Sequence, residues 1–155
     1  MVCTDSSTTS SDLKHLDAPS MSAFPESERE HCALFDFDTT LSCKGYYFYD
    51  YQDPTKISNE CLHSFDMVVI DPPFISHSVW EDYARTAECL LKADKANGTL
   101  VLATTVEENG VLLKTLFGNS CNPALFRPCI PNLVYQYSIF SNWPSSVLST
   151  KNNAL

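Results

Sequence analysis

The sequence predicts an α/β fold with a mostly parallel sheet, and three observations support this prediction. Short apolar runs typical of buried strands recur through the middle of the 155-residue chain. Residues 76–94 lie between two such runs and carry apolar side chains at helical spacing. Two further strand-like segments close the chain and can pair antiparallel. Strands that alternate with helices are typical of a parallel sheet, to which the closing pair adds an antiparallel edge.

The first half of the chain supplies three of the expected strands. Residues 1–7 read as a short strand that runs into a polar turn, and residues 7–16 as a helix capped by Ser or Thr. Residues 18–30 form a proline-broken linker. Residues 31–38 (HCALFDFD) form a buried strand that ends in two acids. Residues 46–51 (YYFYDY) form an aromatic strand that ends in another acid, followed by the turn residues QDPT.

The second half continues the alternation. Residues 65–74 (FDMVVIDPPF) contain the next strand and its terminus, and the helix over 76–94 has Ser76 or Ser78 as its cap. Its apolar face includes Val79, Tyr83 and Ala87. A turn that leads into a buried strand, together over 97–105, and a helix over 106–118, stopped at Gly118, follow. Residues 123–130 and 134–143 form the closing strand pair. We expect a single domain over 1–155, with a frayed tail at 144–155.

The composition narrows the classes of function. A net charge of -9 argues against a broad phosphate-binding surface, which needs Lys and Arg, and fits a basic protein partner better. The seven cysteines include no C-x-x-C pair, which favours buried thiols in a reducing compartment over a zinc site. No apolar run approaches the roughly 20 residues of a membrane span, and the N-terminus lacks a signal-peptide layout. We therefore expect a cytoplasmic protein that binds neither membrane nor metal.

Acidic residues follow three of the predicted strands. Asp36 and Asp38 end the first, Asp50 ends the second, and Asp71 ends the third. In open α/β sheets, ligands bind beyond the carboxyl ends of the strands, where an acid can accept hydrogen bonds from ribose hydroxyls. Each acid taken alone is better explained as a loop cap or as a residue that faces water. Three strand ends with acids favour a site for a nucleoside ligand.

The tetrapeptide Asp71-Pro72-Pro73-Phe74 has an unusual capacity for hydrogen bonding. Proline has a fixed φ and no N–H, and Pro72 also disfavours a helical conformation at Asp71. The segment therefore leaves the sheet stiff and extended, with only acceptors: its carbonyls and the Asp71 carboxylate. Phe74 adds an apolar wall. Such a group can hold an amine by its N–H bonds and leave the nitrogen lone pair directed elsewhere. The alternative is a rigid strand-to-helix turn with no further role.

Four segments together resemble a known family. LFDFD, YYFYDYQDP, HSFDMVVIDPPF and FRPCIPNLVYQYSIFSNW are similar to the elongation factor 1-alpha lysine methyltransferase 1 family, formerly described as adenine-specific DNA methyltransferases. The resemblance runs from about residue 2 to about residue 143 and is strongest over 35–74. It implies a Rossmann-like class I methyltransferase fold, S-adenosylmethionine as methyl donor, and a lysine of elongation factor 1-alpha as acceptor.

The resemblance also implies roles for individual residues. Asp36 would bind the ribose with Asp38 nearby, and Asp50 would lie near the adenine. Asp71, Pro72, Pro73 and Phe74 would form the amine site. The CTDSS segment occupies the position of the family's first motif, which makes Asp5, Ser6 and Ser7 candidates for the methionine end of the cofactor. Phe74, Trp80, Tyr135 or Trp143 could surround the methylated cation, although ordinary packing explains each of the last three as well.

Two alternatives stay open. The acceptor could be the N6 amine of adenine in RNA or DNA, with Phe74 stacked on the flipped base. Members of the family also carry a helical segment before the first strand, whereas this chain begins at that strand. We therefore expect the segment to be missing here, which leaves open a partial domain that is inactive as a methyltransferase.

Overall fold

The computed structural model of the chain describes residues 1–4, 30–41, 43–72, 76–92, 100–128 and 137–152. The strands are β1 (Val2–Thr4), β2 (Cys32–Asp36), β3 (Tyr46–Phe48), β4 (Met67–Ile70), β5 (Leu100–Val106), β6 (Asn122–Pro123) and β7 (Tyr137–Ser141). The α-helices are α3 (His77–Leu90) and α4 (Gly110–Phe117), and the short 3-10 helices are η1 (Asn59–Cys61) and η3 (Glu107–Asn109). The helix expected over 7–16 and most of the linker lie outside the described residues.

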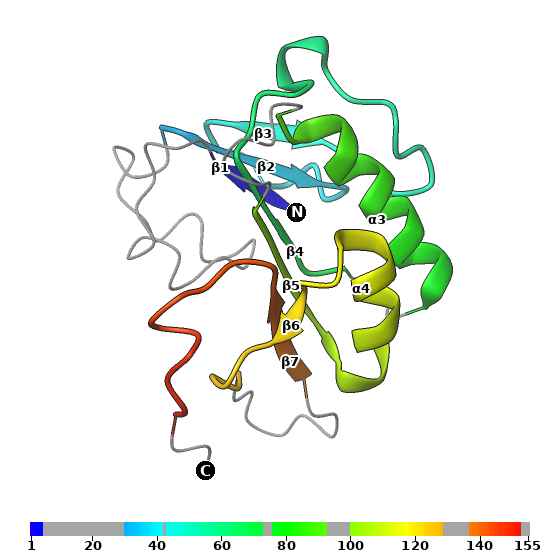
Figure 1. Cartoon of the computed structure of the whole chain (residues 1–155). Helices are drawn as coiled ribbons and strands as arrows, with labels where there is room; N and C mark the ends of the chain where they lie inside the picture. Colours follow the sequence, from blue (N-terminus) through cyan, green and yellow to red (C-terminus); the bar gives the residue numbers. More distant parts are fainter. Residues whose placement is uncertain (5–29, 42, 73–75, 93–99, 129–136, 153–155) are drawn as a thin grey trace.

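In the described part of the chain the strands form one seven-stranded sheet in the order β3-β2-β1-β4-β5-β7-β6 (Figure 1). β2 pairs parallel with β3, and β4 pairs parallel with β5. β2 and β4 point the same way because β1 is antiparallel to both. β6 also shares this direction, since β5 and β6 are each antiparallel to β7. The predicted α/β class with a mostly parallel sheet and an antiparallel C-terminal pair is confirmed.

The strand order also agrees with a Rossmann-like fold. Doubly wound dinucleotide-binding sheets have the order 3-2-1-4-5-6, and here β7 is inserted before β6. The direction of β1 is the exception. Its residues pair in antiparallel register, with Thr4 opposite both Cys32 and Met67 at the amino ends of β2 and β4. A three-residue strand can satisfy its backbone groups in either direction, and three apolar or small residues do not encode which one.

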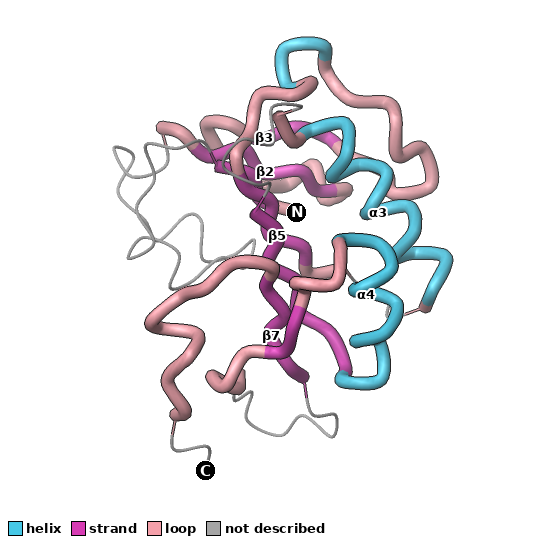
Figure 2. Tube along the Cα trace, in the orientation of Figure 1, coloured by secondary structure: helices cyan, strands magenta, loops and turns pink. Residues whose placement is uncertain are grey.

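Helices α3 and α4 cover one face of the sheet (Figure 2). α3 and α4 contact each other and pack on the strands, and together they cover a core of buried residues. Its completely buried members include Val68, Ile70, Trp80, Leu90 and Leu113. A second cluster on the opposite face is formed by Leu34, Met67 and Val69, against which Trp143 packs. Alternate residues of β4 thus serve the two faces, as strand geometry requires.

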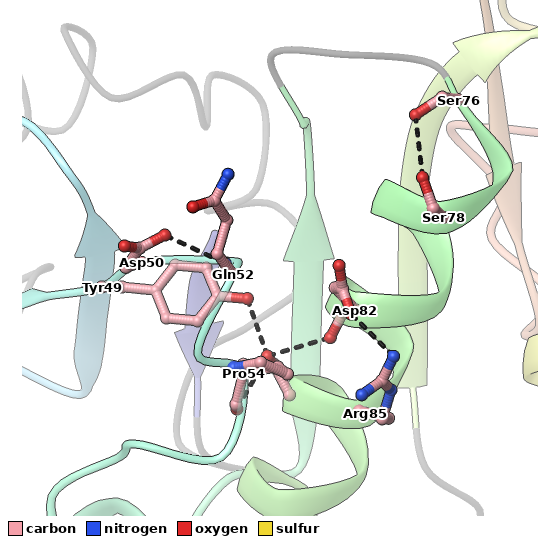
Figure 3. Close-up of polar contacts among 9 residues, drawn as sticks. Tyr49, Asp50, Gln52, Pro54, Ser76, Ser78, Asp82 and Arg85 are labelled. Carbon is pink, nitrogen blue, oxygen red and sulfur yellow. Dashed lines mark hydrogen bonds and ion pairs between the residues drawn. The ribbon is translucent and has the colours of Figure 1, made fainter.

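α3 has the apolar face that its sequence predicts. Val79, Tyr83 and Ala87 are all buried. Ser76 occupies the N-cap position but its side chain makes no capping hydrogen bond. Its hydroxyl lies 3.5 Å from that of Ser78 instead (Figure 3). The helix therefore depends on burial of its apolar face more than on its cap.

The strand expected over 123–130 is wrong for most of its length. Strand structure stops at Pro123, and residues 124–128 have none. Two prolines in this segment cannot donate to a ladder. The backbone N–H groups of Leu125 and Phe126 instead donate to the Leu148 carbonyl, at 3.0 and 3.1 Å. Residues 129–130 lie outside the described part of the chain.

The same bonds tie down the C-terminal segment, which we expected to fray. Asn152 accepts a hydrogen bond from the Arg127 backbone N–H at 2.9 Å and donates one to the Arg127 carbonyl at 2.7 Å. Together with the bonds to Leu148, they hold residues 144–152 along the loop after β6. The composition of this segment did not indicate these bonds because they depend on a loop distant in sequence.

Gly45 sets the approach of β3 to β2. It has a φ of +80°, a conformation that L-residues with a side chain rarely adopt. A Cβ atom at this position would lie 2.5 Å from the Cys32 carbonyl oxygen, which belongs to the backbone of β2. Gly118, which ends α4, also has a positive φ, of +92°, but a Cβ there would meet nothing within 4 Å.

We predict that Gly45→Ala destabilises the protein more than Gly118→Ala. Both variants carry the backbone penalty of about 1–3 kcal/mol for a side chain at positive φ. Only Gly45→Ala adds a clash with backbone that cannot move without disturbing β2. Urea unfolding followed by circular dichroism measures both free energies. Equal losses in the two variants would contradict the structural role assigned to Gly45.

Candidate functional site

The three predicted acidic strand ends lie at one edge of the sheet. Asp36 is the last residue of β2, Asp50 follows β3 by two residues, and Asp71 follows β4 directly. These strands share one direction, so their carboxyl ends meet at the same edge. β1 lies between β2 and β4, which separates those two strands by roughly 10 Å. Such a span suits a ligand with several polar groups better than a single ion.

Asp36 and Asp38 form consecutive turns after β2. The Asp36 carboxylate accepts the Asp38 backbone N–H at 2.9 Å. The Asp38 carboxylate accepts the backbone N–H and the hydroxyl of Thr40, at 2.9 and 2.7 Å. The hydroxyl bond and then the backbone bond hold the pKa of Asp38 below its usual value, so its carboxyl is ionised at neutral pH. The bond from the Asp38 N–H uses Oδ1 of Asp36, and both bonds from Thr40 use Oδ1 of Asp38.

Asp50 has the same local geometry after β3. Its Oδ1 accepts the Gln52 backbone N–H at 2.9 Å (Figure 3). Asp36, Asp38 and Asp50 therefore do cap the loops that follow their strands. Capping uses one oxygen of each carboxylate, and the Oδ2 atoms of Asp36, Asp38 and Asp50 have no hydrogen bond within the described residues. Capping fixes each carboxylate and leaves an acceptor for a ligand.

The end of β4 has the expected order of strand, proline and helix. β4 ends at Ile70, Asp71 is exposed, Pro72 is half-buried, and α3 begins at His77. Pro73 and Phe74 lie outside the described residues. Asp5, Ser6 and Ser7 lie outside them as well. The strand that precedes these three residues, β1, ends with Thr4 at the sheet edge opposite the acids.

A ladder of aromatic rings joins these strand ends to α3. Phe35, directly before Asp36, stacks on Tyr47 at 5.3 Å between ring centroids and meets the Tyr49 ring edge-on at 6.4 Å. Tyr49 in turn meets Tyr83 of α3 at 5.6 Å, and Tyr51 stacks on Tyr83 at 6.2 Å. The ladder fixes α3 against the segment that carries Asp50.

One hydroxyl anchors that segment. Thr86 Oγ1 lies 2.7 Å from the Tyr49 hydroxyl, 3.0 Å from the Pro54 carbonyl and 3.1 Å from the Asp82 carbonyl. The Tyr49 hydroxyl can donate to Thr86, whose single proton is shared between the two carbonyls. Thr86 is completely buried, so these groups have no water to replace the bonds.

An exposed aromatic pair at this edge was not singled out from the sequence. Phe37 and Phe48 are 65% and 53% exposed, and their rings lie 5.3 Å apart. Phe48 pairs with Asp36 in the sheet register, and Phe37 follows it. Two exposed phenylalanines beside fixed carboxylates are unusual on a water-facing surface. The sequence feature that could have indicated this pair is the position of the two phenylalanines close to acids: Phe37 lies between Asp36 and Asp38, and Phe48 lies two residues before Asp50.

Other candidate side chains lie elsewhere. Trp80 is fully buried in the core and Trp143 packs on the opposite face, so packing explains both. Tyr135 lies outside the described residues. A hollow of about 820 Å³ runs between α3 and α4 near Leu91 and Gly118, away from Asp36, Asp50 and Asp71. Among the described residues no group of His, Cys, Asp or Glu could hold a metal ion, and no helix is long and apolar enough to cross a membrane.

Comparisons with known proteins give a consistent result. Residues 3–145 match the family model described as "Probable N6-adenine methyltransferase". The chain is 30% identical over 121 residues to EEF1A lysine methyltransferase 1 of Danio rerio, which covers 75% of this chain and 68% of the relative. It is 31% identical over 119 residues to the Mus musculus protein of that name, covering 74% and 51%. A protein-lysine N-methyltransferase of Dictyostelium discoideum is 29% identical over 122 residues, covering 77% and 56%.

The chain spans about half the length of curated relatives such as those of Dictyostelium and mouse. No solved structure matches it.

We predict that Thr86→Val lowers the free energy of unfolding by about 1–3 kcal/mol, because it removes the buried hydrogen bonds that the Thr86 hydroxyl makes with Tyr49 and Pro54. Thr115→Val on α4 is the matched control. The Thr115 hydroxyl also bonds a carbonyl four residues earlier, that of Val111 at 3.1 Å, but it is exposed. We expect less than about 0.5 kcal/mol for it. Urea unfolding compares the two, and similar losses would exclude an anchoring role for Thr86.

Proposed function

Because the chain belongs to the family described as "Probable N6-adenine methyltransferase", a family of methyltransferases, we propose that it methylates a lysine side chain of a protein, with S-adenosylmethionine as donor. We propose elongation factor 1-alpha as that protein, since the mouse and zebrafish relatives are named for it. The observation that carries the proposal is the meeting of Asp36, Asp50 and Asp71 at one sheet edge. The proposal keeps the cytoplasmic location expected from the sequence.

The residues at this edge fit the parts of the donor. The half-buried Asp36 carboxylate has an oxygen available to accept ribose hydroxyls. Phe37 and Phe48 offer exposed ring surface on which a purine can stack, and Asp50 lies nearby as an acceptor for the adenine amine. Stacking on aromatic side chains is worth about 1–3 kcal/mol per base. Asp38 adds negative charge close to a cationic ligand.

At the end of β4, Asp71 and the carbonyls around Pro72 would hold the acceptor amine. S-adenosylmethionine supplies an electrophilic methyl group, which leaves sulfur as the new bond to nitrogen forms. Lysine must lose its proton first, which costs about 4.6 kcal/mol at pH 7 for an ordinary pKa near 10.4. The Asp71 charge raises the lysine pKa, so we assign Asp71 the role of orienting the amine and not of a general base. Orientation of nitrogen in line with the methyl group is then the main contribution to rate.

We expect two variants to separate the halves of this site. Asp36→Ala should weaken binding of S-adenosylhomocysteine by about 10-fold or more, since hydrogen bonds to a charged group contribute about 1.5–3 kcal/mol. Asp71→Ala should leave that affinity within about 2-fold and lower methyl transfer to elongation factor 1-alpha by more than about 10-fold. Calorimetry measures the first quantity and incorporation of labelled methyl groups the second.

Binding of S-adenosylhomocysteine to the unmodified chain tests the alternative that this is an inactive partial domain. Absence of measurable binding of S-adenosylhomocysteine to the 155-residue chain would support that alternative over the enzyme. Transfer that survives Asp71→Ala would instead show that the amine site lies elsewhere.

A further prediction concerns Phe37. Phe37→Ser should weaken S-adenosylhomocysteine and adenosine by the same factor, of about 5-fold or more, because both present the same purine for stacking. Val111→Ser on α4 is the control: Val111 is 78% exposed and follows β5, which β1 and β4 separate from β2 and the aromatic pair. Unchanged adenosine affinity in the Phe37 variant, or an equal loss in both variants, would rule out a purine site on the aromatic pair.

Methylation of adenine N6 in RNA or DNA is the second candidate, favoured by the description of the family model. The same acceptors can hold an exocyclic amine. The net charge of -9 weighs against it. Substrate binding that weakens steeply with salt, together with methylation of an adenine-containing oligonucleotide, would favour this candidate over the protein substrate.

A further inference from the structure

Tyr83 of α3 is held rigidly beneath the candidate site. Its ring is stacked on Tyr51 at an interplanar angle of 15° and meets the edge of Tyr49 at 67°. The residue is only 6% exposed. Both partner tyrosines belong to the segment that follows β3, and α3 itself starts six residues after Asp71. The ring is thus fixed between the two chain segments that carry Asp50 and Asp71.

The hydroxyl of Tyr83 differs from the other well-packed tyrosine hydroxyls here. The Tyr49 hydroxyl bonds Thr86 at 2.7 Å, and the Tyr46 hydroxyl donates to the Asp36 carbonyl at 3.0 Å. The Tyr83 hydroxyl has no hydrogen-bond partner among the described residues. Among the described residues, the fully enclosed polar side-chain atom that lacks a partner is Nε1 of Trp80, so the Tyr83 hydroxyl is not fully enclosed. Tyr83 is thus a buried residue whose hydroxyl is not fully enclosed.

The ring contacts place Tyr83 beside the segment that carries Asp50, and α3 connects it to the segment that carries Asp71. Burial raises the pKa of Tyr83 most, and the neighbouring Tyr49, Asp36, Asp71 and Tyr51 raise it further. The hydroxyl therefore stays protonated at neutral pH. It is affected by Asp36 on the ribose side and by Asp71 on the amine side. A neutral hydroxyl in this position can accept one N–H bond and can donate one bond of its own.

We propose that Tyr83 is a positioning residue of the acceptor site, whose hydroxyl oxygen accepts an N–H of the substrate amine opposite Asp71. This inference rests on the proposed lysine methyltransferase function. A neutral primary amine has two N–H groups and one lone pair. Acceptors at Asp71 and Tyr83 engage both N–H groups, and the lone pair then points away from both, toward the methyl group that it attacks.

The proposal has a consequence for the number of methyl groups added. A monomethylated amine retains one N–H, and a dimethylated amine has none when neutral. Each transfer therefore removes one of the bonds that orient the nitrogen. Tyr83 should favour the first transfer most and the third least. A purely structural role for the residue would slow all three equally.

The test compares Tyr83→Phe with Tyr47→Phe in the 155-residue chain. Tyr47 also loses a hydroxyl, but that hydroxyl interacts with Cys61 in the hollow lined by His31 and Glu60, away from Asp71. Three quantities are measured: the dissociation constant of S-adenosylhomocysteine, kcat/KM for the protein acceptor, and the methylation states of the product by mass spectrometry. Unfolding curves accompany each variant.

We expect Tyr83→Phe to keep its stability and to bind S-adenosylhomocysteine within about 2-fold of the parent. Its kcat/KM for unmethylated acceptor should fall about 3- to 10-fold, the effect of one neutral hydrogen bond. Transfer to a dimethylated acceptor should not fall, so the share of higher methylation states rises. Tyr47→Phe should leave kcat/KM and the methylation states unchanged.

Three results would overturn the inference. Unchanged kcat/KM and product states in Tyr83→Phe would remove the hydroxyl from the acceptor site. A loss of S-adenosylhomocysteine affinity equal to the loss of transfer would assign it to the cofactor half. A parent chain that binds cofactor but methylates no protein would refute the lysine methyltransferase proposal itself, and that failure is seen before any variant is compared.

Discussion

Parallel strands present their carboxyl ends to one edge of a sheet, and β2, β3 and β4 use this property to gather carboxylates from residues 36, 50 and 71. The other features of the candidate site follow from that shared direction. The aromatic ladder must connect to the same edge because Phe35 and Tyr49 lie at the ends of these strands. α3 reaches the edge with its first turns because it is the next described helix after β4, six residues beyond Asp71. A reversal of any of the three strands would send its acid to the opposite side of the molecule.

In the described structure, Asp36 and Asp50 can cap a loop and bind a ligand at the same time. A loop that leaves a strand needs an acceptor for its early backbone N–H groups, and Asp36 and Asp50 each provide one with Oδ1. The same bond orders the carboxylate before any ligand arrives, which reduces the entropy lost on binding. The carboxylate of Glu107, which follows β5, has different partners from those of Asp36 and Asp50. This carboxylate accepts a hydrogen bond from the Ser138 hydroxyl at 3.0 Å and forms an ion pair with Arg127 at 2.6 Å. The bond from Ser138 and then the contact with Arg127 lower the pKa of Glu107. The charge of Glu107 is therefore already neutralised by Arg127.

The sequence was sufficient where local pattern and position decide the outcome. The alternation of strands and helices, the apolar face of α3 and the acids at strand ends all depend on nearby residues, and each was predicted. The direction of β1, the loss of strand structure after Pro123 and the anchoring of residues 144–152 depend on partners distant in sequence. Tyr83 was predicted only as a core residue, because helical spacing reports burial of a ring and not the position of its hydroxyl. Phe37 and Phe48 were passed over because exposure cannot be read from an aromatic strand.

The antiparallel pairing of β1 with β2 has a consequence for the connection between them. Thr4 stands opposite Cys32, so the chain leaves β1 and enters β2 at neighbouring points of one sheet edge. A connection between these two points is not required to span the sheet from one edge to the other, as a crossover between parallel strands is. The entropic cost of closing such a loop grows only with the logarithm of its length. Insertions and deletions between residues 5 and 31 should thus be inexpensive in free energy, and the edge that carries the acids should not be affected by them.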